Sequence, residues 1–267
     1  NIKQKKMWSN NSKRFDLISV SSRVEQYLTS ASLNLDPSVI KILGSARSDR
    51  IKKDINNYQK NLQFFKKELN INVPNVDFDK LTIALYAPTH RDHINNNVSD
   101  SLYKMENYNP SLLNGFLKKN NIILLVREHS LFEKDNSFNA DFNDSNILNF
   151  SSKLYPNIEL YFSLIDIIIT DYSGIYLDYL NSNKSIAFAH FDIEEYEDKR
   201  GLILPKDILF PGFSFKSQED LIRYLEFRFE IDKTFIHKRN YLNSLLFETS
   251  PIGACKRTML EIDKLII

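Results

Sequence analysis

The sequence has a single cysteine, Cys255, no apolar run longer than a β-strand and no excess of charge of either sign. One cysteine cannot form a disulfide within the chain, which fits a reducing compartment. Apolar runs such as residues 122–126 are only strand-sized, so we expect no transmembrane helix. The 35 basic and 34 acidic residues give a net charge of +1. No overall basic field exists to hold a nucleic acid, and we predict no nucleic-acid partner.

Several catalytic and targeting signals are missing as well. The sequence has no H-E-x-x-H, no C-x-x-C, no Walker A and no G-x-S-x-G pattern, and the last absence argues against a serine hydrolase. His93, His190 and His237 show no metal-ligand spacing, so we predict no metal site in the chain. Residues 1–6 are polar with no apolar stretch behind them, so we expect no secretory signal. Because the chain lacks an initiator methionine, we expect it to be part of a longer protein.

Short apolar runs alternate with helical patterns along the 267 residues, which suffice for one large domain or two small ones. This alternation is typical of an α/β fold with a doubly wound parallel sheet. Runs such as residues 167–169 are apolar on both faces, which suits a sheet covered by helices on both sides. The predicted strands are 16–21, 39–43, 81–87, 122–127, 165–170 and 185–189. The predicted helices are 22–30, 52–69, 111–119, 158–164, 174–181, 219–230 and 256–266.

Ligands of such sheets bind beyond the carboxyl ends of the strands, so polar clusters after apolar runs are candidate sites. Four clusters qualify: residues 44–50, 87–92, 127–129 and 170–174. In the last cluster a strand ends, hydroxyl residues follow and a helix begins near Gly174. Free backbone N–H groups beside Ser173 would make an anion site there. Alternatively, Asp171 or Ser173 is only an N-cap.

Charged residues in these clusters suit a phosphate ligand. Arginine forms bidentate phosphate contacts, and four arginines follow apolar segments: Arg47, Arg50, Arg91 and Arg127. His90 and His129 are candidates for an acid, a base or a cation facing a diphosphate, or are structural histidines. Asp178 either accepts hydrogen bonds from ligand hydroxyls or faces solvent. The acidic, aromatic stretch 191–197 is either a loop over the site or a solvated face, and the second is favoured.

Taken in this order, the clusters resemble motifs of the CDP-glycerol glycerophosphotransferase family, which contains the teichoic acid polymerases and primases. Residues 85–92 (L-Y-A-P-T-H-R-D) resemble its Y-A-P-T-x-R-D motif, and residues 127–129 (R-E-H) its R-x-H motif. Residues 166–174 (D-I-I-I-T-D-Y-S-G) with Asp178 resemble D-x-x-I-T-D-Y-S-S followed by an acidic residue. Residues 191–201 resemble D-x-x-x-Y…R-G. Weaker likenesses are residues 44–50 and the Pro-Gly pair at 211–212.

The resemblance implies a GT-B fold, in which two Rossmann-like domains flank a cleft and the C-terminal domain binds a CDP-linked donor. Residues 1–50 would then be the end of the N-terminal, acceptor-side domain or a connecting segment. Residues 51–267 would be the Rossmann-like donor-binding domain. The family's H-G-T motif, which supplies a catalytic histidine, is absent here, so the acceptor-side domain would lie upstream of this chain.

The implied activity is transfer of glycerol-phosphate or ribitol-phosphate from CDP-glycerol or CDP-ribitol to a hydroxyl of a cell-wall or capsule polymer, with release of CMP. The acceptor would be lipid-linked or polymeric. The full protein would be cytoplasmic and peripheral at the inner face of the bacterial membrane. No metal ligand is implied, although the diphosphate could bring Mg²⁺ with it. The implied catalytic residues are Arg127 and His129. The implied donor-binding residues are Thr89, His90, Arg91, Thr170, Asp171, Ser173, Gly174 and Asp178, with weaker phosphate contacts from Arg47, Arg50 and Arg257.

Departures from the family pattern leave the donor open. Ser130 stands where the family has proline after R-x-H, Gly174 replaces a second serine, and His90 replaces a tryptophan. The terminal D-G-x-A-S-x-R motif survives only as residues 254–257. CDP-glycerol, CDP-ribitol and a related capsule precursor all remain candidates. A UDP-sugar-dependent GT-B glycosyltransferase or epimerase, and a non-catalytic nucleotide-binding module, are the alternative functions.

The substitution His129→Ala tests the implied catalytic role. In the full-length protein it should lower turnover about a hundredfold or more, because a well-placed charge-stabilising donor commonly contributes that much. Circular dichroism should show an unchanged fold. Wild-type turnover in this variant would contradict the assignment.

Overall fold

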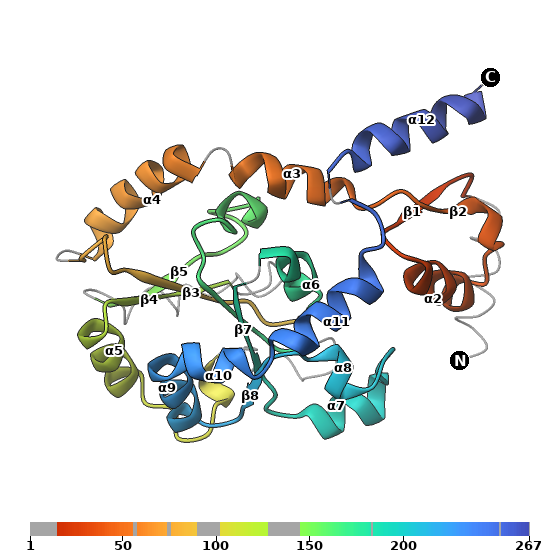
Figure 1. Ribbon diagram of the computed structural model, residues 1–267. Coiled ribbons are helices and arrows are strands. Elements are labelled where there is room, and N and C mark those ends of the chain that lie inside the picture. The colour runs from red at the N-terminus through yellow and green to blue at the C-terminus, as the bar shows by residue number, and fades with distance from the viewer. Residues whose placement is uncertain are drawn as a thin grey trace. The chain divides into compact units, whose positions relative to one another are not determined.

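The computed structural model describes residues 15–55, 58–73, 76–89, 102–127, 145–182, 184–250 and 252–266. The chain divides into two compact units, one formed by Asn1–Lys53 with Asn240–Ile267 and the other by Asp54–Arg239 (Figure 1). The first break lies close to the predicted boundary after residue 50. Residues 240–267 group with the first unit, whereas the sequence predicted one domain over residues 51–267.

The first unit contains a small parallel sheet of two strands, β1 and β2. The helix between them, α2, begins where the Ser22 side chain accepts a hydrogen bond from the Glu25 backbone N. Val20, Leu35 and Ile40 form the buried core that this helix covers. The elements are β1 (Ile18–Val20), α2 (Arg23–Leu33), η2 (Pro37–Val39), β2 (Ile40–Ile42), α3 (Ala46–Ile55), α11 (Ile236–Leu246) and α12 (Ala254–Ile266), of which α3 and α11 cross into the second unit.

Two charged side chains tie the start of this unit to the end of the chain. The Asp49 carboxylate accepts hydrogen bonds from the backbone N of Gly253 and Cys255, at the start of α12. The Arg257 guanidinium donates to three backbone carbonyl oxygens, those of Leu43, Ser250 and Ile252. These contacts explain why residues 240–267 belong to the first unit.

The second unit is built on a six-stranded sheet in which every pair of neighbouring strands is parallel. Its strands are β3 (Thr82–Tyr86), β4 (Ile122–Val126), β5 (Ile147–Asn149), β6 (Ile167–Thr170), β7 (Ser185–Ala189) and β8 (Phe213–Phe215). Its helices are α4 (Tyr58–Asn72), η3 (Leu102–Lys104), α5 (Pro110–Lys119), η5 (Ile158–Tyr161), α6 (Ile175–Tyr179), η6 (Leu180–Ser182), α7 (Ile193–Arg200), α8 (Lys206–Leu209), α9 (Gln218–Glu226) and α10 (Arg228–Lys233).

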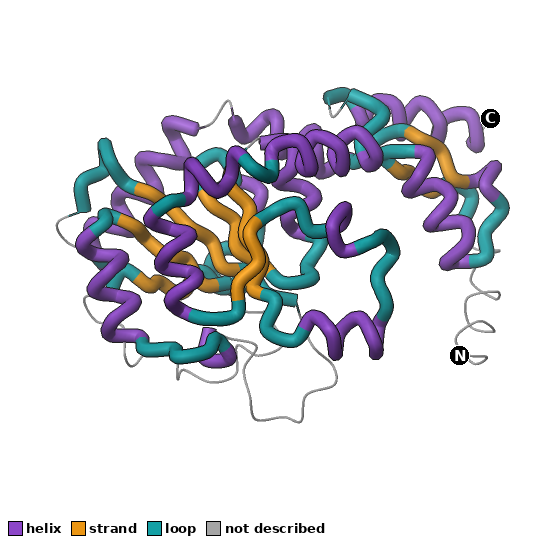
Figure 2. Tube along the Cα trace, turned by 60° about the horizontal axis from the view of Figure 1, so that its bottom comes forward, coloured by secondary structure: helices purple, strands orange, loops and turns teal. Residues whose placement is uncertain are grey.

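The strand order is β5-β4-β3-β6-β7-β8, and Figure 2 shows these strands side by side in orange. Counted along the chain, this is the 3-2-1-4-5-6 order of a Rossmann sheet. The order reverses between β3 and β6, which are neighbours although Leu85 and Ile168 are far apart in the sequence. The carboxyl ends of β3 and β6 therefore form the switch point at which such sheets bind ligands.

Both faces of the sheet are covered, as the apolar strand pattern predicted. On one face, Ala84, Leu124 and Ile169 pack with Leu117 of α5 and Leu221 of α9 in a single buried cluster. On the other face, the ring of Tyr176 in α6 packs edge-on against Phe188 of β7, with ring centroids 5.1 Å apart. The predicted doubly wound parallel α/β fold is thus confirmed in this unit.

Some predicted elements differ from the structure. The helix predicted over residues 52–69 is two helices, α3 and α4. Residues 158–164 hold the short 3₁₀ helix η5 in place of an α-helix. The sequence did not predict β5 and β8, which have three residues each and no longer apolar run around them. It also did not predict α7, because the charged sequence of this helix is typical of a solvated face. Within the described ranges, no helix is long and apolar enough to cross a membrane.

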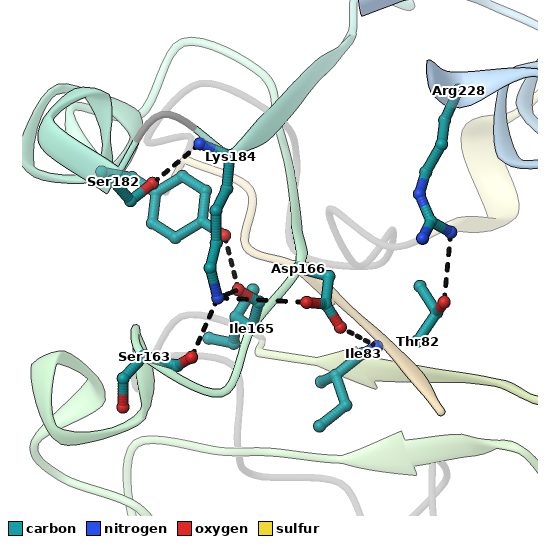
Figure 3. A network of polar contacts seen from close by, with 9 residues as sticks. Thr82, Ile83, Ser163, Ile165, Asp166, Ser182, Lys184 and Arg228 are labelled. Atoms are coloured by element: carbon teal, nitrogen blue, oxygen red, sulfur yellow. Dashed lines mark hydrogen bonds and ion pairs between the residues drawn. The ribbon is translucent and has the colours of Figure 1, made fainter. Parts of the chain in front are cut away.

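The amino ends of β3, β6 and β7 are joined by a polar network (Figure 3). Lys184 Nζ donates to the carbonyl oxygens of Ser163 and Ile165, at 2.8 and 2.6 Å, and lies 3.9 Å from Asp166 Oδ1. Asp166 Oδ2 accepts from the backbone N of Ile83 in β3 at 2.9 Å. Burial lowers the pKa of Lys184, and the Asp166 carboxylate acts in the opposite direction. This edge of the sheet is held by its own charged groups.

A buried ion pair continues this edge. Arg239 Nη2 lies 3.0 Å from Asp232 Oδ1 and also donates to the Asp232 carbonyl oxygen at 2.8 Å. Arg239 Nη1 donates to the carbonyl oxygen of Lys184 at 3.0 Å, and Tyr224 Oη lies 3.2 Å from Asp232 Oδ1. The pair therefore fixes the end of the second unit against the start of β7.

Arg239→Met should lower the free energy of unfolding by about 3 kcal/mol or more, because it leaves the buried Asp232 carboxylate without its cation. Urea unfolding followed by circular dichroism measures the change. The matched control Arg223→Met removes an exposed arginine of α9 and should change the value by about 0.5 kcal/mol or less. Equal stabilities of the two variants would show that the pair does not support the fold.

Candidate functional site

The carboxyl ends of β3 and β6 are fastened together by Asp171. This residue directly follows β6 and is 2% exposed. Its Oδ1 atom accepts hydrogen bonds from the backbone N and Oγ1 of Thr89, at 2.7 and 2.6 Å. The same atom accepts from the backbone N of Tyr172 and Ser173, at 2.6 and 3.3 Å. The loop after β3 and the turn after β6, which the sequence predicted as parts of one site, thus meet at the switch point of the sheet.

The Asp171 carboxylate occupies N–H groups that the sequence predicted for an anion. The sequence predicted that free N–H groups beside Ser173 would bind phosphate, or that Asp171 or Ser173 would cap a helix. Two of those N–H groups donate to Asp171, and the helix that follows, α6, has only five residues. Ser173 Oγ is 3.4 Å from the backbone N of Ile175, which donates to it. The Ser173 hydroxyl is half-buried, and the N–H groups of Tyr172 and Ser173 are already engaged by Asp171.

Three other predicted residues lie on or beside the same turn. Thr170 is fully buried, and its Oγ1 donates to the Ala87 carbonyl oxygen at 2.6 Å, which makes it a second fastening between the two loops. Gly174 has a φ of −65°, and a Cβ atom there would meet nothing within 4 Å. Neither backbone conformation nor packing requires glycine at this position. Asp178 is half-buried in the first turn of α6.

An aromatic clamp joins this turn to the loop after β7. The Tyr172 ring stacks on the Tyr196 ring of α7, with centroids 3.7 Å apart and an angle of 13°. The Tyr172 hydroxyl donates to Asp192 Oδ1 at 3.0 Å. Sequence reasoning missed this clamp, since it favoured a solvated face for residues 191–197. The signal that could have found it is the aromatic and acidic content of that stretch, which also lies within the family resemblance.

His190 lies beneath the clamp and is a further residue that the sequence did not place in the site. It is 4% exposed, and its ring stacks on Tyr172 with centroids 5.3 Å apart. Its Nδ1 atom lies 3.1 Å from Ser214 Oγ. Burial lowers the pKa of His190 to about 4, although the Asp171 carboxylate acts in the opposite direction. The imidazole is therefore neutral near pH 7, and it cannot serve as the cation for a phosphate there.

Arg127 follows β4, at the same edge of the sheet. Its Nη1 atom donates to the carbonyl oxygens of Phe150 and Tyr155, at 3.2 and 2.8 Å, beyond the end of β5. The Phe150 and Tyr155 rings stack with centroids 4.1 Å apart. Arg127 thus holds the loop after β5, a positioning contact that the sequence did not predict.

The remaining predicted site residues fall into two groups. Three belong to the first unit: Arg47, Arg50 and Arg257. The Arg257 guanidinium already donates to three backbone carbonyl oxygens. Three lie outside the described residues: His90, Arg91 and His129. Among the residues that are described, no three histidine, cysteine or carboxylate side chains converge to hold a metal ion.

A protein-family model matches nearly all of this chain. The family model described as CDP-Glycerol:Poly(glycerophosphate) glycerophosphotransferase matches residues 1–259. The chain belongs to this family. The resemblance predicted from the four strand-end motifs is therefore confirmed.

Similar proteins carry related names. The teichoic acid glycerol-phosphate primase of Bacillus subtilis is 29% identical over 181 residues, which cover 66% of this chain and 41% of the primase. The teichoic acid poly(ribitol-phosphate) polymerase of Bacillus spizizenii is 27% identical over 177 residues, or 65% of this chain and 27% of that protein. The chain therefore spans less than half the length of these two relatives.

A solved structure confirms the fold class. The wall teichoic acid polymerase TagF superimposes with a TM-score of 0.71 at 21% identity. The match covers 97% of this chain and 59% of the TagF chain. A likeness at this identity shows the fold, and the predicted GT-B-type α/β architecture agrees with it.

Lowering the pH should destabilise the second unit through His190. Its pKa is lower in the folded chain than in the unfolded chain, so stability falls as the pH drops from about 6.5 towards 4. Between pH 7 and pH 5 this group should account for a loss of about 2 kcal/mol. Urea unfolding at both pH values measures the loss in the wild type and in His190→Phe.

His190→Phe should show the smaller loss, because phenylalanine keeps a stacking ring and takes up no proton. The matched control His237→Phe alters an exposed histidine of α11 and should behave like the wild type. An unchanged loss in His190→Phe would contradict a neutral, buried His190.

Proposed function

We propose that this chain forms the donor-binding part of a polyol-phosphate transferase. A hydroxyl oxygen of a cell-wall or capsule polymer attacks the β-phosphorus of CDP-glycerol, and the phosphorus–oxygen bond to CMP breaks. CMP leaves, and the hydroxyl proton passes to a base. Family membership supports this reaction class. The main structural support is the pair of hydrogen bonds that Thr89 donates to Asp171. They join two loops at the switch point where Rossmann sheets bind nucleotides.

The described residues would bind and orient the donor. Catalysis of this kind is mainly positioning and charge stabilisation. The Ser173 hydroxyl would donate to a phosphate oxygen, and Asp178 would accept hydrogen bonds from ribose or polyol hydroxyls. Arg127 would add positive charge beside the loop that it holds. Contributions from Arg91 and His129 remain predictions from the resemblance.

Glycerol-phosphate is the polyol that we propose, with ribitol-phosphate as the second candidate. The family description names poly(glycerophosphate), and the B. subtilis relative is a glycerol-phosphate primase. TagF has also been solved after a soak with CDPG. Ribitol-phosphate stays open because the B. spizizenii relative is a ribitol-phosphate polymerase. We further propose that the whole protein works at the inner face of the membrane on a lipid-linked or polymeric acceptor, with an acceptor-side domain outside this chain.

Calorimetric titration of the chain with CDP-glycerol, CDP-ribitol, CMP and UDP-glucose tests the proposal. We expect binding of CDP-glycerol, weakened about tenfold in Ser173→Ala, because a hydrogen bond to a charged phosphate is lost. Gly174→Ser should bind at least as tightly as the wild type, since a Cβ atom at this position meets nothing within 4 Å. Ser244→Ala, which changes an exposed serine of α11, is the matched control.

The other results of this titration are equally decisive. Tighter binding of CDP-ribitol would change the polyol but keep the reaction. Binding of UDP-glucose alone would favour the UDP-sugar alternative. No binding of any CDP-polyol would contradict a donor site formed by this chain.

A further inference from the structure

The side chain of Tyr172 joins the candidate donor turn to helix α7. Tyr172 immediately precedes Ser173, whose hydroxyl is the proposed phosphate contact. The Tyr172 ring stacks on Tyr196 with centroids 3.7 Å apart, and the Tyr172 hydroxyl donates to Asp192 Oδ1. Because a rigid peptide bond connects the two residues, a movement of the Tyr172 backbone also moves Ser173. The contacts of Tyr172 therefore bear directly on where the Ser173 hydroxyl lies.

The hydrogen bonds of Asp171 anchor the start of this turn more closely than its end. Asp171 Oδ1 accepts from the backbone N of Tyr172 at 2.6 Å and from that of Ser173 at 3.3 Å, which is longer than most bonds of this kind. The contact of Ile175 N with Ser173 Oγ is longer still, at 3.4 Å. Gly174, at the start of α6, supplies no side-chain cap. The stacked Tyr172 side chain thus adds a restraint where these bonds lengthen.

Asp192 contacts the turn in place of capping its own helix. It stands at the N-cap position of α7, where an aspartate side chain usually accepts from a backbone N–H of the first turn. Here its side chain makes no capping hydrogen bond. It accepts instead from the hydroxyl of Tyr172 at 3.0 Å, across 20 residues of sequence. The side chain best placed to stabilise the helix start is therefore used to hold Tyr172.

Helix α7 contributes little to the buried core. None of its residues is buried. Glu197 pairs with Lys206 of α8, and Glu194 lies 3.5 Å from Lys216, which follows β8. Exposed ion pairs of this kind contribute little to stability. Core packing therefore does not account for this helix, and its contact with the turn offers a role for it.

We propose that Tyr196 is a positioning residue of the donor site, which acts through Tyr172 on Ser173. Its ring holds the Tyr172 ring, so that the Ser173 hydroxyl is ordered before the donor phosphate binds. Ordering a contact in advance lowers the entropy cost of binding. The inference rests on the proposed function, which supplies the phosphate ligand. It adds a residue of α7 that acts through Tyr172 rather than by its own contact with the phosphate.

Calorimetric titration with CDP-glycerol tests the inference in a double-mutant cycle. Tyr196→Ala should weaken binding about threefold to tenfold, the range expected when an aromatic stack is lost. In a chain that also carries Ser173→Ala, the same substitution should weaken binding by less than about twofold, because the residue that it positions is gone. Tyr196→Phe keeps the ring and should bind within about twofold of the wild type. The matched control Tyr241→Ala removes an exposed tyrosine of α11 and should bind like the wild type.

Hydrogen exchange of the backbone N–H groups of Tyr172 and Ser173, followed by NMR, gives a readout that needs no ligand. Both groups donate to Asp171. In Tyr196→Ala they should exchange about threefold to tenfold faster, because the turn opens more easily without the stack. The N–H groups of β6 should keep their wild-type rates, which would show that the sheet is intact.

Three binding results would overturn the inference: wild-type affinity in Tyr196→Ala, equal weakening with and without the Ser173 hydroxyl, or a loss in Tyr196→Phe as large as in Tyr196→Ala. Failure of the proposed function has a different signature, because the wild type would then bind no CDP-polyol at all. Hydrogen exchange decides the role of Tyr196 in that case. Unchanged rates at Tyr172 and Ser173 would overturn its hold on the turn, and faster rates would support it.

Discussion

The arrangement of the candidate site depends on one buried carboxylate. A charge taken out of water is costly unless it is hydrogen-bonded, and Asp171 Oδ1 meets this condition with donors from Thr89, Tyr172 and Ser173. Thr89 is 82 residues away in sequence. The two segments meet only because β3 and β6 are parallel neighbours that end at the same edge of the sheet. The sheet order thus permits the contact, and the contact then fixes where the Ser173 hydroxyl lies.

The two edges of the sheet use their polar groups differently. At the amino ends, the charged side chains make their hydrogen bonds within the protein. Lys184 donates to the Ile165 carbonyl oxygen, Asp166 accepts from the backbone N of Ile83, and Arg239 donates to the Lys184 carbonyl oxygen. At the carboxyl ends, Asp171 holds the loops after β3 and β6 together, and the half-buried Ser173 hydroxyl lies beside it. This is the edge at which we propose that the donor binds.

In the second unit, the sequence predicted the strands of four or five residues and missed the two strands of three residues. β3, β4 and β7 are five residues long and almost wholly buried, so each leaves an apolar run that can be read directly. β5 and β8 have three residues each, and what holds them is pairing with a neighbour, which no local pattern records. Pairing also sets the strand order, so the switch point could be expected from the fold class but not located from the sequence.

The site was predictable to the extent that its residues follow long strands. Thr89 and Asp171 follow β3 and β6, and both were expected to lie in it. The clamp was not expected, because α7 is a charged helix and contacts the turn through the stack of Tyr196 on Tyr172. That contact depends on where the loop after β7 returns to the sheet. Long-range contacts of this kind also place His190 under the clamp.

Packing requires glycine at position 212 but not at position 174. At Gly212 the backbone of β7 excludes any side chain, so glycine there is a requirement of packing. At Gly174 nothing lies within 4 Å of a Cβ atom, and the backbone conformation is one that any residue adopts. The missing hydroxyl therefore has no structural cause. The turn itself is fixed by Asp171, which accepts from the backbone N of Tyr172 and Ser173.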